Sequence, residues 1–369
     1  MPKAKETVLE IDLRALAHNY NYLKSKLDPK TRFLGVVKAF AYGSDAITIA
    51  KKLEALGADY LAVAYTKEGV ALRKAGIKVP ILVLHPLPVS FEELITHCLE
   101  PSLYSPKILV DFLAMAEKKD QKNYPVHLKF NTGLNRLGFW ENDVDYIAEK
   151  LKEREEVRIT SIFSHLAASD DLNEHEFTQN QIATFEKISI EIDKRLNHKP
   201  FRHLLNTSGI INYPEAQYNM VRSGIGLYGF GNEAEIDAQL KPVATLKTVI
   251  SQRHKIEPGE TVGYNRAFTS DGYRITATLP LGHADGIGRH YGNGKGYVSI
   301  KGQKASIIGN VCMDMIMVDV TGIECKVGDE VIIFGKDISV EQLAGAADTI
   351  SYELLTGISN RVTRQIRED

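Results

Sequence analysis

Charged and polar residues follow short apolar runs at several points in the first 230 residues. Lysine and histidine can serve as nucleophiles or bases, and arginine binds anions. The positions are Lys38, Lys129 with Arg136, His165, Asn206 with Thr207, and Arg222. Whether they act together depends on whether the fold brings the ends of these runs to one place.

Lys38 stands directly after the apolar pair Val36-Val37. A buried lysine is costly unless it is paired or loses its charge. Formation of an imine removes the charge, and desolvation lowers the pKa of the amine so that it can act as nucleophile or base. An ion-paired structural lysine explains the position equally well.

The other positions also have a structural interpretation beside a functional one. His165 suits a satisfied histidine of the core or rim, and Arg222 suits a salt bridge. Lys129 and Arg136 repel each other at one site, so they require an anion: a neighbouring carboxylate, a bound phosphate or a modified lysine.

Glycines follow Arg222 in the segment Arg222-Ser-Gly224-Ile225-Gly226-Leu-Tyr228-Gly229. They leave backbone N–H groups accessible to a phosphate, although the spacing matches neither a Rossmann nor a Walker loop. Further along the chain, Tyr264 follows Val262-Gly263 and suits either a rim aromatic or a reactive phenol. His283 and His290 lack metal-binding spacing, so no metal is expected.

Eight apolar runs of strand length alternate with amphipathic stretches over the same 200 residues. Most runs are apolar on both faces, as in parallel strands covered by helices. Eight such units favour an α/β fold, an N-terminal (β/α)₈ barrel, whose ligands bind at the carboxyl ends of the strands. The runs are Phe33–Val37, Tyr60–Ala64, Pro80–Leu84, Glu100–Leu103, Val126–Phe130, Thr160–Phe163, Arg202–Leu205 and Asn219–Val221.

After about residue 235 the pattern changes to strands joined by tight glycine-rich turns, which predicts a mostly antiparallel β domain. We therefore expect a barrel domain over 1–235, a linker at Gly231–Ala238 and a β domain over 236–369. The chain start is interpreted as polar residues and a helix, and the end as a charged tail. The expected strands are Pro242–Gln252, Tyr273–Leu281, Gly296–Ile300, Lys304–Ile308, Met315–Val320 and Glu330–Phe334, with helices at Val340–Ala347 and Ile350–Leu355.

Composition limits the class of protein. The 369 residues include 45 Lys+Arg and 47 Asp+Glu, a net charge of −2 that argues against nucleic acid or an anionic membrane as partner. No apolar run is long enough to span a bilayer, and the start lacks the apolar core of a signal peptide. Three scattered cysteines form no disulfide framework. The sequence predicts a cytoplasmic protein.

Taken together, the motifs resemble those of alanine racemases. They occur in the family's order along nearly the whole chain, and the family's barrel followed by a β domain agrees with the elements expected above. The matching segments are Val36-Val-Lys38-Ala-Phe-Ala-Tyr42-Gly43, Lys129…Thr132-Gly133…Arg136, Ser164-His165, Asn206-Thr207-Ser208, Val221–Gly229, Val262-Gly-Tyr264, Ala284-Asp285-Gly286, Cys312-Met313-Asp314 and Ser351-Tyr352-Glu353…Arg361-Val362.

The resemblance implies a role for each matching residue. Lys38 would hold pyridoxal 5′-phosphate (PLP) as an imine, His165 would pack on its ring, and Arg222 would face the pyridine nitrogen. Lys129 would be carbamylated, and Arg136 would orient the ring hydroxyl and the substrate carboxylate. The expected phosphate and cofactor contacts are Tyr42, Asn206, Thr207, Gly224, Ile225 and Tyr352, and the Met313 backbone N–H is the second carboxylate contact.

The resemblance further implies a head-to-tail homodimer that interconverts L- and D-alanine and supplies D-alanine for peptidoglycan. Lys38 and Tyr264 would be the two bases, with Tyr264 acting in the partner subunit's site.

Departures from the family pattern bear on the range of substrates. His283 stands where a tyrosine usually guards the substrate entrance, and Phe40 replaces a usual asparagine. Ser44-Asp45, Asn131 and Leu134 also differ. A racemase of broad or shifted specificity is therefore the main alternative, ahead of a decarboxylase on the same fold or a non-catalytic PLP-handling protein.

Overall fold

A computed structural model describes residues 6–231 and 234–368, which form two compact units. The barrel unit comprises residues 17–41 and 46–240, and the sheet unit comprises residues 6–16, 42–45 and 241–368. The sequence predicts a single boundary, between 235 and 236, whereas residues 6–16 and 42–45 also belong to the sheet unit. Part of the expected linker, residues 232–233, lies outside the described residues, and α10 covers Ala234–Asp237.

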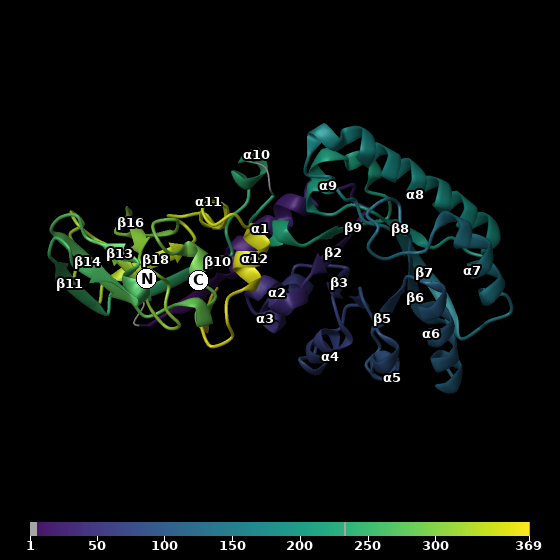
Figure 1. The fold of residues 1–369 in the computed structure, drawn as a ribbon. Helices are drawn as coiled ribbons and strands as arrows, with labels where there is room; N and C mark the ends of the chain where they lie inside the picture. Colours follow the sequence, from purple (N-terminus) through teal and green to yellow (C-terminus); the bar gives the residue numbers. More distant parts are fainter. Residues whose placement is uncertain (1–5, 232–233, 369) are drawn as a thin grey trace. The chain divides into compact units, whose positions relative to one another are not determined.

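The barrel unit contains a closed barrel of eight parallel strands, which confirms the predicted (β/α)₈ fold (Figure 1). Each expected run overlaps a strand of this barrel, with ends shifted by at most a few residues. The strands, in order around the barrel, are β2 (Arg32–Val36), β3 (Tyr60–Val63), β4 (Ile81–Val83), β5 (Glu100–Leu103), β6 (Tyr124–Lys129), β7 (Val157–Phe163), β8 (Phe201–His203) and β9 (Met220–Ser223).

Helices cover the outside of these strands, and local sequence fixes their ends (Figure 1). Ser105 caps α6 by accepting a hydrogen bond from the Ile108 N–H at 3.3 Å, as expected of an N-cap serine. Left-handed glycines follow α3 and α4, at Gly57 and Gly76. The helices are α1 (Leu13–Lys24), α2 (Lys38–Gly43), α3 (Ala46–Ala55), α4 (Thr66–Lys74), α5 (Phe91–Thr96), α6 (Pro106–Lys118), α7 (Val144–Leu151), α8 (His175–Arg195) and α9 (Thr207–Asn212).

The sheet unit is built on a nine-stranded, mostly antiparallel sheet in the order β11-β14-β17-β16-β15-β18-β10-β1-β19. A separate hairpin pairs β12 with β13. The strands are β1 (Val8–Asp12), β10 (Ala244–Val249), β11 (Gln252–Ile256), β12 (Thr261–Val262), β13 (Phe268–Thr269), β14 (Arg274–Leu279), β15 (Tyr297–Ile300), β16 (Gln303–Ile308), β17 (Ile316–Asp319), β18 (Glu330–Phe334) and β19 (Thr363–Arg367), with helices α11 (Val340–Gly345) and α12 (Ser351–Thr356).

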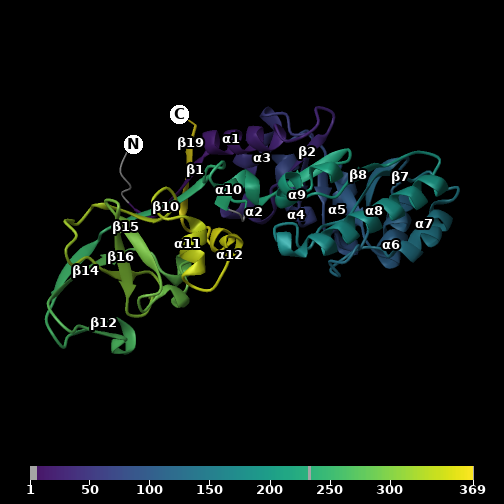
Figure 2. The same ribbon diagram turned by 90° about the horizontal axis from the view of Figure 1, so that it is seen from above.

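Two of these strands were not predicted. The expected helix near the chain start is present as α1, but β1 precedes it, and β19 forms where a charged tail was expected. β1 pairs with β10 in antiparallel and with β19 in parallel orientation (Figure 2). Its partners lie more than 230 residues away in the sequence, so no local pattern reveals the pairing. The charged residues of β19 are tolerated because this strand forms the edge of the sheet.

None of the described helices is both long and apolar enough to cross a membrane.

The position of β1 between two strands predicts how the sheet unit responds to mutation. Leu9 is 1% exposed, so Leu9→Ala should destabilise the protein by about 3 kcal/mol through lost burial and a cavity. Hydrogen exchange should accelerate in β10 and β19. The matched control is Val89→Ala, because Val89 is 92% exposed and should change stability by less than about 0.5 kcal/mol. Equal stability of the two variants would contradict the assigned role of β1.

Candidate active site

The barrel brings five of the predicted positions to one end. Lys38 follows β2, Lys129 ends β6, and His165 follows β7 by two residues. Thr207 follows β8, and Arg222 is the third residue of β9. Since the strands of a closed parallel barrel all point the same way, these side chains gather at the carboxyl end, where such barrels hold ligands.

The backbone after Lys38 is strained. Ala39, Phe40, Ala41 and Tyr42 have φ values of 52°, 56°, 53° and 55°, and Gly43 follows at 80°, so the turn labelled α2 is left-handed. A left-handed helical residue other than glycine costs about 1–2 kcal/mol. Such strain persists only where the surroundings hold it in place, and it is concentrated at functional sites.

Glu68 holds the start of this turn. Its carboxylate accepts the backbone N–H of Ala39 at 2.6 Å, and also those of Ala64 and Tyr65 at 2.7 and 3.0 Å. The carboxyl end of β3 and the strained turn are therefore fixed to one side chain. Burial and the charge of Arg136 lower the pKa of Lys38, whereas Glu68 raises it, so a carboxylate influences Lys38 without forming an ion pair with it.

Lys129 is buried among cations. Burial, followed by the charges of Arg136, Arg222 and Lys38, lowers the pKa of its amine to about 8. Its Nζ lies 5.9 Å from the centre of the Phe163 ring. No carboxylate contributes to this shift, so the anion that Lys129 and Arg136 require is not a neighbouring carboxylate among the described residues.

Arg222 is buried and makes no ion pair with a described residue, so the salt-bridge interpretation is wrong. It donates to the carbonyls of His203, Ser164 and Leu204 at 3.1, 2.6 and 2.8 Å. Two imidazoles also accept from it: Nδ1 of His203 at 2.7 Å and Nδ1 of His165 at 3.3 Å. Burial lowers its pKa to about 9, which leaves the guanidinium charged at neutral pH.

Arg222 also determines the charge state of the two histidines that it contacts. Burial and the charge of Arg222 lower the pKa of His165 and of His203 well below the usual value, so both rings are neutral. The Phe163 ring stacks on His203 with centroids 4.7 Å apart and carries Arg222 at 5.3 Å from its centre. Both cationic side chains, Lys129 and Arg222, therefore lie close to the same aromatic ring.

Thr207 and the glycine-rich segment form a compact backbone corner. The Thr207 hydroxyl accepts the Gly226 N–H at 3.2 Å and pairs with the Ser223 hydroxyl at 3.0 Å. Asn206 caps α9 by accepting the Gly209 N–H at 2.9 Å. A Cβ on Gly226 would lie 2.4 Å from Cγ2 of Thr207, so only glycine allows this approach. Gly224 and Ile225 directly precede Gly226 and so belong to the same backbone corner.

The remaining predicted residues belong to the sheet unit. Tyr42 and Tyr352 lie with ring centroids 5.9 Å apart. Burial and the proximity of Tyr352 raise the pKa of Tyr42, so its phenol stays protonated and can donate a hydrogen bond.

Tyr264 lies beside the β12–β13 hairpin and is 68% exposed. Its position is set by the backbone: Gly263 has φ 79°, and the side-chain amide of Asn310 donates to the Tyr264 carbonyl at 3.0 Å. Asn310 lies three residues before Met313, so one loop supports both predicted residues.

Met313 and His283 share a second support. The His283 and Ala284 N–H groups donate to the carbonyls of Cys312 and Met313, each at 3.0 Å. Gly282 permits this approach, since a Cβ there would lie 2.3 Å from the Cys312 carbonyl oxygen. The Arg361 guanidinium locks the two segments together by binding Asp285 and Asp314.

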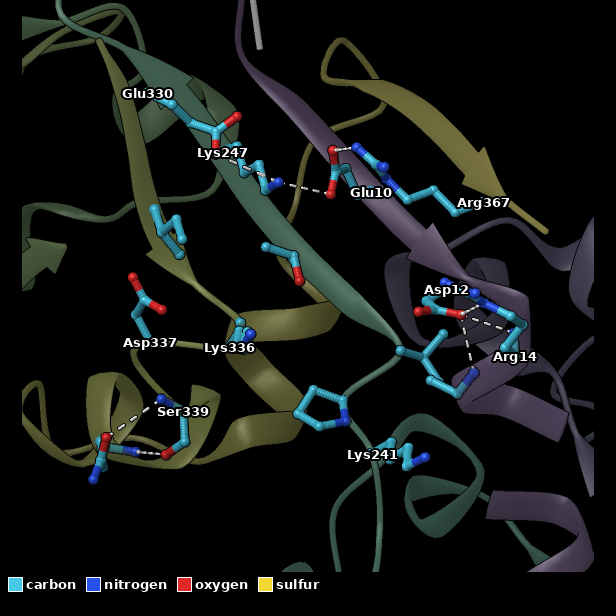
Figure 3. Close-up of a pocket in the computed structure, with 17 residues that line it drawn as sticks. Glu10, Asp12, Arg14, Lys241, Lys247, Glu330, Lys336, Asp337, Ser339 and Arg367 are labelled. Carbon is cyan, nitrogen blue, oxygen red and sulfur yellow. Dashed lines mark hydrogen bonds and ion pairs between the residues drawn. The ribbon is translucent and has the colours of Figure 1, made fainter. Parts of the chain in front are cut away.

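A pocket of the sheet unit was not predicted (Figure 3). Within it Lys247 lies 2.9 Å from Glu10 and 3.5 Å from Glu330, and Arg367 also pairs with Glu10. These charges neutralise one another, which distinguishes the pocket from the cationic barrel mouth.

Sequence reasoning missed several polar residues inside the barrel. Glu100, His127 and Ser161 are buried within strands, and His203 was noted only as part of a run. One signal was present: His127 lies two residues before Lys129 on the same strand, so the alternation of a β-strand places both side chains on the same face. Glu68 had no such signal, because its partners are backbone groups.

The comparisons with known proteins agree with this arrangement. Residues 11–231 match the model described as "Alanine racemase, N-terminal domain", and residues 243–366 match "Alanine racemase, C-terminal domain". A curated alanine racemase from Thermodesulfovibrio yellowstonii is 36% identical over 364 residues, which is 96% of each chain.

Solved structures are similar over the full length. An alanine racemase of Clostridium difficile 630 matches with a TM-score of 0.92 at 35% identity, covering 100% of this chain and 97% of that one. An alanine racemase of Bartonella henselae with covalently bound pyridoxal phosphate matches with a TM-score of 0.90 at 29% identity, covering 99% and 100%. With two family models spanning most of its length and a relative this similar, the chain belongs to the alanine racemase family.

Proposed function

We propose that this protein is a PLP-dependent racemase that interconverts L- and D-alanine by moving a proton between the two faces of the substrate. One observation carries the proposal: the barrel mouth gathers Lys38, Lys129 and Arg222 around a space where Lys129 and Arg222 have no carboxylate partner among the described residues. Such a site suits a ligand with several negative charges.

The residues present fit PLP. Lys38 has a lowered pKa, which makes its amine available for imine formation. The corner of Thr207 and Gly226 leaves no room for a further Cβ and offers backbone N–H groups of Gly224 and Ile225 for a phosphate. Tyr42 and Tyr352 would donate hydrogen bonds to the same group. Asn206 would support the cofactor indirectly through α9.

When bound, PLP supplies an electron sink that stabilises negative charge at the substrate's Cα. Lys38 Nζ would take or return the Cα proton on one face, and the Tyr264 hydroxyl would do so on the other. Tyrosine needs help to act as a base at neutral pH, and His165, kept neutral beside Arg222, is the candidate.

Arg222 would donate an N–H to the pyridine nitrogen and thereby keep that nitrogen unprotonated. This limits the charge that the ring can take up and so favours racemisation over decarboxylation. Arg136 and the Met313 N–H would hold the substrate carboxylate.

A homodimer would complete the site. The proposal rests on the exposure of Tyr264, which is 68% in the single chain, and of Met313, which is 59%. Side chains with catalytic roles at such exposure gain a defined environment if a partner subunit covers them. We infer that the sheet unit of one subunit completes the barrel mouth of the other.

D-alanine for peptidoglycan is the proposed product, and the cytoplasmic location stays a prediction. A racemase of broader specificity is a second candidate, favoured by His283. Its backbone is tied to the segment that carries Met313, and His283 itself is exposed.

The function is tested by incorporation of deuterium at Cα in D₂O with chiral analysis, for the PLP-loaded protein given L-alanine, D-alanine and a panel of other amino acids. Exchange with interconversion of the alanine enantiomers is expected. Exchange only with other amino acids would replace alanine as the substrate, and no exchange with any of them would refute the racemase proposal.

Tyr264→Phe removes the second base and should leave PLP bound. We expect the rate from L-alanine to fall by about 10²- to 10⁴-fold, the usual contribution of general acid–base catalysis. Tyr273→Phe is a matched control, because Tyr273 is similarly exposed at 66% and lies outside the proposed site. Wild-type rates in both directions for Tyr264→Phe would exclude the two-base mechanism.

Lys38→Ala should abolish the covalent attachment of PLP. The measurement is intact-protein mass after borohydride reduction, which fixes an imine permanently. The wild type should gain the mass of one cofactor and Lys38→Ala none, whereas Lys67→Ala, a control at an exposed helix position, should behave as wild type. Labelling that survives in Lys38→Ala would move the attachment to another lysine.

Lys129 is proposed to carry a carbamate, which would turn one of the clustered cations into the anion that Arg136 requires. Only the neutral amine reacts with CO₂, and the lowered pKa of about 8 means that the neutral form prevails above that pH. Labelling with ¹³C-bicarbonate should therefore be stronger at pH 9 than at pH 6.5. The carbamate NMR signal should vanish in Lys129→Arg; its persistence would assign it elsewhere.

A further inference from the structure

A chain of buried polar side chains crosses the barrel beneath the proposed site. The Arg222 guanidinium contacts Nδ1 of His203 at 2.7 Å, and Nε2 of His203 lies 2.9 Å from the Ser161 hydroxyl. Ser161 in turn contacts Nδ1 of His127 at 2.5 Å, and Nε2 of His127 lies 2.6 Å from the Glu100 carboxylate. Four hydrogen bonds thus connect Arg222 in β9 with Glu100, the first residue of β5.

The chemistry of the two ends fixes the direction of three of the four bonds, and the fourth follows because the Ser161 hydroxyl, already an acceptor, has its own proton left to donate. Arginine can only donate, so His203 accepts at Nδ1 and, being neutral, carries its proton on Nε2. That proton goes to Ser161. A carboxylate can only accept, so His127 donates from Nε2 to Glu100, and the Ser161 hydroxyl donates to Nδ1 of His127. All four donors point from Arg222 toward Glu100, without a conflict at any link.

Burial makes the loss of any of these hydrogen bonds costly. His127, Ser161 and His203 are each 0% exposed, and an unsatisfied polar group at such depth is expensive. In a low-dielectric interior, aligned hydrogen bonds also polarise one another. Glu100 is further held by a hydrogen bond with the Tyr60 hydroxyl, an interaction that contributes, after burial, to the raised pKa of that phenol.

We propose that Glu100, His127, Ser161 and His203 are positioning residues for Arg222. Ser161 accepts the Nε2 proton of His203 and so holds the ring with its unprotonated Nδ1 toward the guanidinium. The chain also extends the influence of the Glu100 carboxylate to a buried arginine that has no ion pair of its own among the described residues. The reverse tautomer would place an N–H of His203 against an N–H of Arg222. This inference rests on the proposed function, since the role of Arg222 is to face the pyridine nitrogen.

The test interrupts the chain at its middle. Ser161→Ala removes the hydroxyl that links the two histidines, and Ser161→Thr retains it. Ser102→Ala is a matched control, because Ser102 is also a 0% exposed barrel serine and its hydroxyl has no hydrogen-bond partner among the described residues.

The first readout is the ¹⁵N spectrum of histidine-labelled, PLP-loaded protein, which reports the protonation of each ring nitrogen without requiring activity. Wild type, Ser161→Thr and Ser102→Ala should show the same Nε2–H signal for His203, with a bare Nδ1. Ser161→Ala should keep this tautomer, which Arg222 dictates, but shift the Nε2–H signal, because this group loses its acceptor. An unchanged Nε2–H signal of His203 in Ser161→Ala would overturn the proposal.

The second readout separates kcat from KM. Since Arg222 is expected to act on the cofactor ring rather than on the substrate carboxylate, Ser161→Ala should lower kcat about 10-fold, a typical loss for a supporting residue, and leave KM unchanged. Ser161→Thr should restore kcat. A loss of kcat equal to that of Ser102→Ala would refute the positioning role. A wild-type protein that lacks exchange at Cα would instead refute the racemase proposal, while the ¹⁵N result would still stand on its own.

Discussion

The positive charge collected inside the barrel mouth is the constraint on which the rest of the structure depends. Lys38, Lys129 and Arg222 lie close together in a partly buried space. Burial, followed by the charges of Arg136, Arg222 and Lys38, lowers the pKa of Lys129 to about 8. A protein gains nothing from such an arrangement unless an anion is bound there or a charge is removed. In the proposed function, the same electrostatics would favour binding of a phosphorylated, carboxylate-bearing complex and would make the amines of Lys38 and Lys129 reactive.

Charged side chains around these sites hold the backbone in fixed conformations. Glu68 binds three N–H groups from two segments and so holds the left-handed turn after Lys38. In the sheet unit, Arg361 joins the segments that carry His283 and Met313 through Asp285 and Asp314. In both cases a charged side chain positions a backbone rather than contacting a ligand. The strained turn after Lys38 and the position of Met313 thus depend on residues that have no proposed role in the chemistry.

The barrel was predictable because each strand carries a local signal: an apolar run buried on both faces, followed by a polar residue. The same periodicity placed Lys38, Lys129, His165, Thr207 and Arg222 at strand ends. β1 and β19 could not be predicted, because their stability comes from their pairing with each other and with β10 rather than from their own sequence. The partners of Arg222 could not be predicted either, because they come from distant parts of the sequence. They are carbonyls and imidazoles instead of carboxylates.

The chain of hydrogen bonds between Arg222 and Glu100 explains why the barrel interior contains two buried histidines and a serine. A hydrophobic interior at these positions would pack equally well, but Arg222 would then lose an acceptor, and a buried guanidinium with an unsatisfied N–H is less stable than one fully bonded. Glu100 acts on Arg222 through the chain and not as a direct partner. In the proposed function, a carboxylate bound directly to Arg222 would compete with the pyridine nitrogen for its N–H groups.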